Sequence, residues 1–135
     1  MKSGEGKMGS EEEELIRRIK ATRGWILPEQ EFMVRRDIEF FRRHNDKVDH
    51  FMNRDGALSR KVLELLYIVA LCVRLPAGET QTYVKNHIRQ AFEHGATERE
   101  ILEAVELTIF PGGSPSMNAG IKALSEVIEE RERVG

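Results

Sequence analysis

Two residues in the middle of this chain have side chains suited to moving protons. Glu64 is the only charged residue between Val62 and Val73, where nearly every other residue is apolar. An ionised carboxylate in such a helix needs a partner, and His87 in the next predicted helix is the best candidate. A histidine accepts or donates a proton near neutral pH. The pair therefore suggests acid–base chemistry such as enolisation or a lactone reaction.

The predicted helix around His87 adds two hydroxyl groups to this candidate site. Thr80, Tyr83 and His87 occupy positions i, i+3 and i+7, which share one side of a helix. That face therefore presents two hydroxyls beside an imidazole.

Structural interpretations compete with these functional ones. Glu64 could instead face a gap open to solvent or bind Arg60 one turn earlier, and a lone helical histidine often has only a structural role. Cys72, within the apolar run, is most simply a small buried hydrophobic residue. Glu106 is either a solvated flank of its helix or a group that faces a cavity or a subunit interface.

The histidines do not have the spacing of a metal site. His87 and His94 share a helix face but lie two turns, about 10 Å, apart along its axis, so they cannot chelate one ion unaided. His44 and His50 do not share a face. We therefore predict no metal.

Composition narrows the class of protein further. The chain has 135 residues, which suits one domain over residues 11–135 behind a flexible tail over residues 1–10. A net charge of −2 gives no indication of nucleic acid or of an anionic membrane as a partner. One cysteine makes no internal disulfide, and no apolar run is long enough to span a bilayer. We expect a cytoplasmic protein.

Helix signals dominate the chain, and strand alternation of useful length is absent, so the sequence predicts an all-α fold. Pro28 fits the first position of a helix, a break is expected near Asp37, and Gly95 suits a helix C-terminus. Thr97 and Glu100 form a capping box. We predict about six or seven helices, built around an antiparallel pair over residues 58–75 and 79–94. A connector over residues 112–115 should precede the last helix.

Short motifs also recur along the chain in a particular order. They are Arg23-Gly24 with Pro28 downstream, Asp37-Ile38-Glu39-Phe40, Leu58-Ser59-Arg60-Lys61-Val62-Leu63-Glu64-Leu65, His87-Ile88-Arg89-Gln90-Ala91, Gly95-Ala96-Thr97-Glu98-Arg99-Glu100-Ile101, and Gly113-Ser114-Pro115 with Asn118. Together they resemble the carboxymuconolactone decarboxylase family, the all-α superfamily that includes alkylhydroperoxidase D-like proteins. The resemblance covers roughly Leu15 to Ile128 and implies an alkylhydroperoxidase D-like helical bundle.

In the peroxidase branch of that family, a Glu is followed by a C-x-x-C pair and then by a His four residues after the second Cys. Glu64 and His87 match the acid and the histidine, whereas Thr80 and Tyr83 stand at the two cysteine positions. A self-contained thiol peroxidase needs both sulfurs, so the resemblance disfavours this activity. Redox chemistry would then require a bond between the Cys72 residues of two chains.

The decarboxylase branch also lacks those cysteines and acts on a carboxylated lactone without metal or organic cofactor. The resemblance implies proton transfer by His87, orientation of His87 by Glu64, and binding of substrate oxygens by Tyr83 and Thr80. It also implies a homo-oligomer, trimeric or hexameric. The alternative is a non-catalytic oligomeric binding protein on the same scaffold. Substrate identity does not follow, because residues 110–112 depart from the pattern of that branch.

Overall fold

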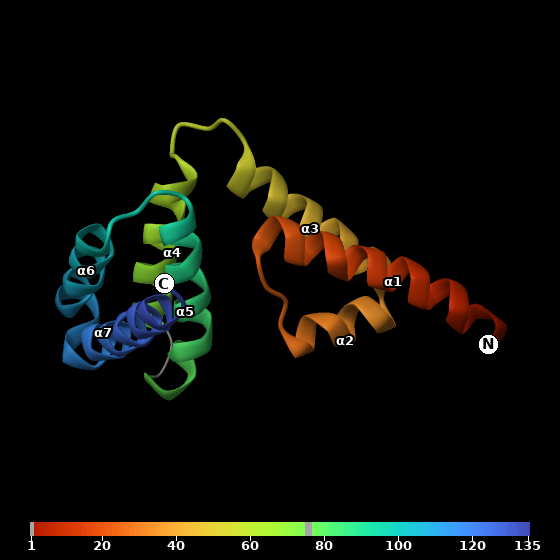
Figure 1. Ribbon diagram of the computed structural model, residues 1–135. Helices are drawn as coiled ribbons and strands as arrows, with labels where there is room; N and C mark the ends of the chain where they lie inside the picture. Colours follow the sequence, from red (N-terminus) through yellow and green to blue (C-terminus); the bar gives the residue numbers. More distant parts are fainter. Residues whose placement is uncertain (1, 75–76) are drawn as a thin grey trace. The chain divides into compact units, whose positions relative to one another are not determined.

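The computed structural model describes the backbone of residues 2–74 and 77–135, with side chains for residues 9–74 and 81–135. Within these ranges the chain forms seven helices and no strand, which confirms the predicted all-α class (Figure 1). None of the described helices is long and apolar enough to cross a membrane. The helices are α1 (Lys2–Arg23), α2 (Pro28–Arg36), α3 (Ile38–Asn53), α4 (Arg60–Arg74), α5 (Ala77–Glu93), α6 (Glu98–Leu107) and α7 (Ile109–Val134).

The chain divides into two compact units, Met1–Asp55 and Gly56–Gly135. In the first unit, α1, α2 and α3 pack around a core of Leu15, Ile16, Ile19, Val34 and Phe41. In the second unit, α4 to α7 pack around a larger apolar core. Glu64 and His87 both belong to the second unit. That residues 11–135 form one domain stays a prediction.

The helix boundaries of the first unit follow local signals in the sequence. Pro28 is the first residue of α2, as predicted. Asp37 separates α2 from α3, and its side chain accepts a hydrogen bond from the backbone N–H of Phe40 at 3.3 Å. Such a cap satisfies one of the backbone donors that a helix start leaves unpaired. The break expected near Asp37 is therefore confirmed.

The start of α1 differs from the prediction. We expected a tail over residues 1–10 and a helix after Ser10, but α1 begins at Lys2. Extending an existing helix costs much less free energy than nucleating a new one. The residues before Ser10 therefore continue the helix of the Glu-rich segment, although three of them are glycines.

The second unit is built on the antiparallel neighbours α4 and α5 (Figure 1). Gly95 follows α5 with a φ of 95°, a value that favours glycine. Thr97 and Glu100 then begin α6, where each side chain accepts a hydrogen bond from the backbone N–H of the other. Both the predicted helix end and the predicted capping box are confirmed.

The break predicted over residues 112–115 is present as a kink at Gly113, which divides α7 into two helical parts. Gly113 has a φ of 81° and a ψ of 178°, outside the helical region, while the residues on both sides are helical. The N–H of Gly112 bonds the carbonyl of Thr108 at 2.9 Å, so a helical turn already forms before the kink. The helical run therefore starts earlier than predicted, at Ile109, and the part after Gly113 is the predicted last helix.

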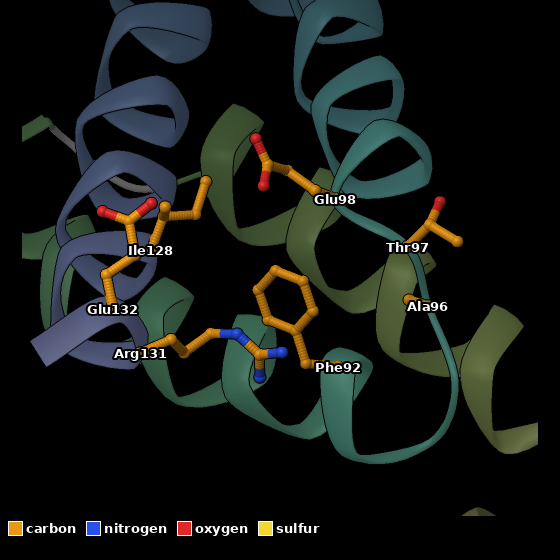
Figure 2. A pocket seen from close by; sticks show the side chains of 7 residues that line it. All are labelled: Phe92, Ala96, Thr97, Glu98, Ile128, Arg131 and Glu132. Atoms are coloured by element: carbon orange, nitrogen blue, oxygen red, sulfur yellow. The ribbon is translucent and has the colours of Figure 1, made fainter. Parts of the chain in front are cut away.

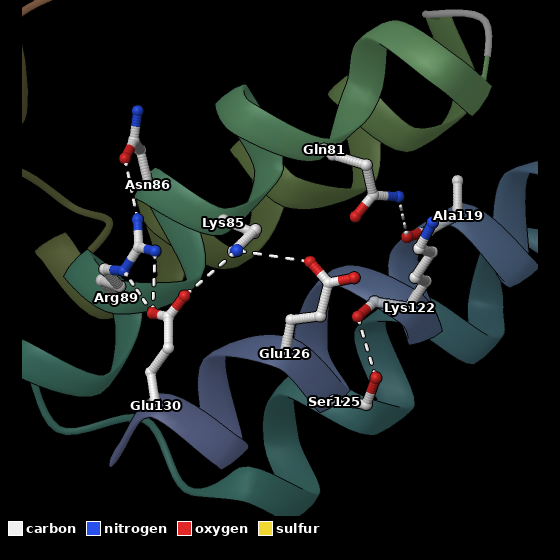
Figure 3. A network of polar contacts seen from close by, with 9 residues as sticks. All are labelled: Gln81, Lys85, Asn86, Arg89, Ala119, Lys122, Ser125, Glu126 and Glu130. Carbon is white, nitrogen blue, oxygen red and sulfur yellow. Dashed lines mark hydrogen bonds and ion pairs between the residues drawn. The ribbon is translucent and has the colours of Figure 1, made fainter. Parts of the chain in front are cut away.

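A network of ion pairs joins α5 to α7 on the side of α5 that carries Lys85 and Arg89 (Figure 3). Lys85 Nζ lies 3.2 Å from Glu126 and 3.1 Å from Glu130. Arg89 contacts the same Glu130 at 2.8 Å. Because several charges share one network, its contribution exceeds that of an isolated surface pair. This network helps to fix α5, and with it His87, against α7.

Gly120 marks a close approach of α7 to α6 and α4. A Cβ atom added at this buried position would lie 2.6 Å from Val105 Cγ1 on α6 and 3.0 Å from Cys72 Sγ on α4. Real Cβ atoms do not approach other heavy atoms at 2.6 Å. Only glycine at position 120 therefore allows the observed helix packing.

We expect Gly120→Ala to destabilise the protein by a net of about 1–2 kcal/mol, because overpacking outweighs the gain of up to about 1 kcal/mol in helix propensity. Urea unfolding measures the change. Adding Val105→Ala, which removes the clashing methyl group, should make the double variant more stable than the sum of the two single effects predicts. Strictly additive effects would show that the two side chains do not compete for this space.

Candidate active site

Glu64 is almost completely enclosed in the second unit. It lies on the inner face of α4 with Ile68 and Cys72, and it is 1% exposed. Arg60, one turn earlier, donates a hydrogen bond from Nε to Glu64 Oε2 at 2.7 Å. The contact with Arg60 that the sequence allowed is thus present, but it involves only one of the two carboxylate oxygens of Glu64.

The other oxygen of Glu64 contacts His87. The distance from His87 Nδ1 to Glu64 Oε1 is 2.7 Å, and the His87 residue is 9% exposed. This bond crosses from α5 to α4, so the antiparallel packing of these two helices creates it. The expected pairing of Glu64 with His87 is therefore present, while their catalytic roles stay predictions.

The charge state of Glu64 decides how this bond is arranged. Burial alone would raise the pKa of Glu64, but the hydrogen bonds and charges of His87 and Arg60 outweigh burial and hold the pKa below its ordinary value. Glu64 is therefore ionised at neutral pH and only accepts hydrogen bonds. Nδ1 of His87 must then carry the hydrogen, which places the lone pair of the neutral ring at Nε2.

Gln90 extends the chain of polar contacts that begins at His87 and Glu64 and continues through Arg60. Arg60 Nη2 donates a hydrogen bond to Gln90 Oε1 at 3.1 Å, and Gln90 lies three residues after His87 on α5. Arg60 therefore links α4 to α5 and holds the oxygen of Glu64 that His87 does not contact. Sequence reasoning missed Gln90, although its i+3 spacing from His87 places it on the same helix face.

Tyr67 is the second neighbour of His87 that sequence reasoning missed. Its ring stacks on the imidazole with a centroid distance of 3.9 Å and an interplanar angle of 12°. Tyr67 lies three residues after Glu64, so both reach His87 from one face of α4. That i+3 spacing was the available signal. The residue type of Tyr67 alone gives no further signal, because aromatic residues in an apolar helix usually belong to the core.

The two predicted substrate-binding residues stand differently in the structure. Tyr83 is 37% exposed and precedes His87 by one turn of α5, so its side chain is accessible to solvent. The side chain of Thr80 lies outside the described residues. The structure thus gathers Arg60, Glu64, Tyr67, His87 and Gln90 into one cluster.

Cys72 and Glu106 match the simpler interpretations of their sequence positions. Cys72 is 0% exposed, and burial raises the pKa of its thiol to about 11. A protonated thiol is a poor nucleophile, and a fully enclosed one cannot reach the cysteine of a second chain. These facts argue against redox chemistry through a Cys72 bond. Glu106 is exposed, as a solvated flank should be.

A groove of about 340 Å³ lies where the ends of α5 and α7 meet the start of α6 (Figure 2). Arg131 extends over the ring of Phe92, with its guanidinium carbon 3.9 Å from the ring centroid. Glu98 and Glu132 also line the groove. With one cation and two carboxylates around it, the groove favours no single ligand charge. The pattern of the sequence does not point to this groove.

The fold and the site define an all-helical protein with a buried glutamate–histidine pair between two antiparallel helices. Residues 39–126 match the carboxymuconolactone decarboxylase family, and the chain belongs to this family. No curated protein matches the sequence. Among solved structures, the chain is similar to a protein of Burkholderia xenovorans LB400 that is provisionally described as a carboxymuconolactone decarboxylase. The TM-score is 0.77 at 18% identity, over 94% of this chain and 96% of that one, so this likeness concerns the fold.

Proposed function

We propose that this chain is an acid–base enzyme of the carboxymuconolactone decarboxylase type, acting without a cofactor on a small carboxylated lactone or a related acid. The observation that carries the proposal is the 2.7 Å hydrogen bond between His87 Nδ1 and buried Glu64. A buried, ionised carboxylate that accepts the Nδ1–H bond fixes the tautomer and the orientation of a histidine, as in other acid–base sites. Family membership supports the class of reaction.

In a decarboxylation, the bond between the carboxylate carbon and the ring carbon breaks and CO₂ leaves. The electron pair moves into the adjacent carbonyl group and forms an enolate. Protonated His87 then delivers its Nε2 proton to carbon and becomes neutral, and solvent replaces that proton. In an isomerisation, neutral Nε2 takes a proton from one carbon, exchanges it with solvent and delivers a solvent proton to another carbon. Glu64 keeps Nε2 as the working atom in both reactions.

The other residues of the cluster have supporting roles in this proposal. Arg60 compensates the charge of Glu64, so the carboxylate remains ionised although it is buried. We assign Tyr83 and Thr80 to the oxygen atoms of the substrate. The exposed side chain of Tyr83 favours this role for that residue.

The proposal extends to assembly and location. We propose a cytoplasmic homo-oligomer, a trimer or a hexamer. The support comes from large apolar side chains on α2 and α3 that remain exposed, which are Phe32 at 59%, Phe40 at 62% and Phe51 at 48%. Exposed apolar surface of this kind often marks a contact between proteins.

The experiment is a substrate panel in D₂O, with small carboxylated lactones and β-keto acids followed by proton and carbon NMR. We expect one of them to lose CO₂ or shift a double bond and to gain one deuterium at the carbon that His87 protonates. Saturable binding without CO₂ loss or deuterium exchange would instead identify a non-catalytic binding protein.

A further inference from the structure

Tyr67 occupies a position that core packing does not explain. Its side chain is 43% exposed, whereas His87 beneath it is 9% exposed. An aromatic ring gains most by full burial, yet Tyr67 holds one face against His87 and leaves much of its surface accessible. The ring therefore lies between the imidazole and the surface of the second unit.

The two contacts of His87 with α4 restrain different motions of its ring. The hydrogen bond to Glu64 holds one ring atom, Nδ1, at 2.7 Å. A single hydrogen bond tolerates a range of angles, so the ring plane can still tilt by rotation about the Cβ–Cγ bond of His87. The nearly parallel stack on Tyr67, at 12°, opposes that rotation because it would separate the two rings. Both restraints together fix the direction in which Nε2 points.

We infer that Tyr67 is a positioning residue, which holds the imidazole plane of His87 and closes one of its faces. Substrate must then approach Nε2 along the ring edge or from the opposite face. The stack uses the ring of Tyr67 and not its hydroxyl group, so phenylalanine should replace it. The catalytic part of this inference rests on the proposed function, whereas the restraint on the ring does not.

The test compares Tyr67→Leu, which removes the stack, with Tyr67→Phe, which keeps it. Phe110→Leu is the matched control, because Phe110 is an aromatic residue of the same unit that is 83% exposed on α7. NMR of the His87 ring protons is the direct measurement. A ring stacked under an aromatic face has proton resonances shifted upfield, so Tyr67→Leu should move them downfield while the other two variants leave them in place.

Turnover supplies the second measurement. Tyr67→Leu should lower kcat by about 10- to 100-fold with a smaller change in KM, since a misdirected Nε2 affects the reacting geometry more than binding. Tyr67→Phe should retain kcat. A loss caused by poor folding would lower the amount of active enzyme and broaden the resonances throughout the second unit, which separates it from lost positioning.

Each outcome decides the inference. If the His87 resonances of Tyr67→Leu are unchanged, the two rings do not stack in solution. If the resonances move but kcat is unchanged, Tyr67 does not position His87 for catalysis. If Tyr67→Leu does not fold, nuclear Overhauser contacts between the Tyr67 and His87 rings of the unaltered protein decide whether the stack exists. If the unaltered protein turns over no substrate, the proposed function fails, and the ring resonances still decide the restraint.

Discussion

His87→Gln is expected to lower kcat by about 10²- to 10⁴-fold, the usual contribution of a positioned proton-transfer group. Glutamine retains an N–H donor that can bind Glu64, but it has no atom that exchanges a proton near neutral pH. The protein should therefore fold and bind substrate as before. Steady-state kinetics on the substrate found in the D₂O panel measures the loss, and urea unfolding checks the fold.

His94→Gln is the control for this prediction. His94 lies two turns after His87, just beyond the end of α5; it is exposed, and its Nδ1 lies 2.9 Å from the backbone carbonyl of Gln90. Removing its imidazole should leave kcat unchanged. If His87→Gln retained full turnover, proton transfer would have to be assigned to another group.

Glu64→Ala is expected to destabilise the protein by about 3 kcal/mol, because it leaves buried polar partners without their carboxylate. The side chains of Arg60 and His87, at 12% and 11% exposure, have little access to water that could replace it. Glu103→Ala is the matched control. The Arg99–Glu103 pair has the same i, i+4 spacing and a contact of 2.8 Å, but its side chains are 75% and 61% exposed. Its loss should have a much smaller effect, and equal losses would show that burial of Glu64 is not decisive.

The difference in stability between the natural protein and the Glu64→Ala variant should depend on pH. The pKa of Glu64 is below its ordinary value of 4.5 in the folded protein, so the folded state binds this proton less readily than the unfolded state. Its contribution to stability is therefore complete above about pH 4.5 and disappears as the pH falls through the lower folded-state pKa. The difference in unfolding free energy between the natural protein and Glu64→Ala should shrink in this acid range.

The parts of the fold that the sequence predicted well depend on local chemistry. Helix starts and ends depend on residues only a few positions apart, so neighbouring positions in the sequence predict them. Examples are Pro28, Asp37, Gly95 and the Thr97 capping box. The extent of α1 was wrong in the prediction, and a helical run begins at Ile109, before the break at Gly113, rather than after Ser114. In both places a helical turn forms in a segment that contains glycine, where intrinsic propensity is weak and the adjoining turns decide the outcome.

Within the site, the sequence identified the groups whose presence is chemically unusual. A carboxylate in an apolar helix and a histidine in the next helix demand an explanation from their residue types alone. Tyr67 and Gln90 are ordinary residue types at their positions. Whether they contact His87 and Arg60 depends on the axial register of α4 against α5. Side-chain packing between the two helices sets this register, and the residue pattern within either helix alone does not determine it.

The contacts that orient His87 have a practical consequence for protein engineering. Arg60, Glu64 and Tyr67 lie within two turns of α4, and His87 and Gln90 lie within one turn of α5. These five side chains form a module that two helical segments can carry. Transplanted at the same spacings onto another antiparallel helix pair, they should recreate an oriented imidazole in a host that has none. The transplanted module would need neither the kink at Gly113, nor the groove beside Arg131, nor the first unit.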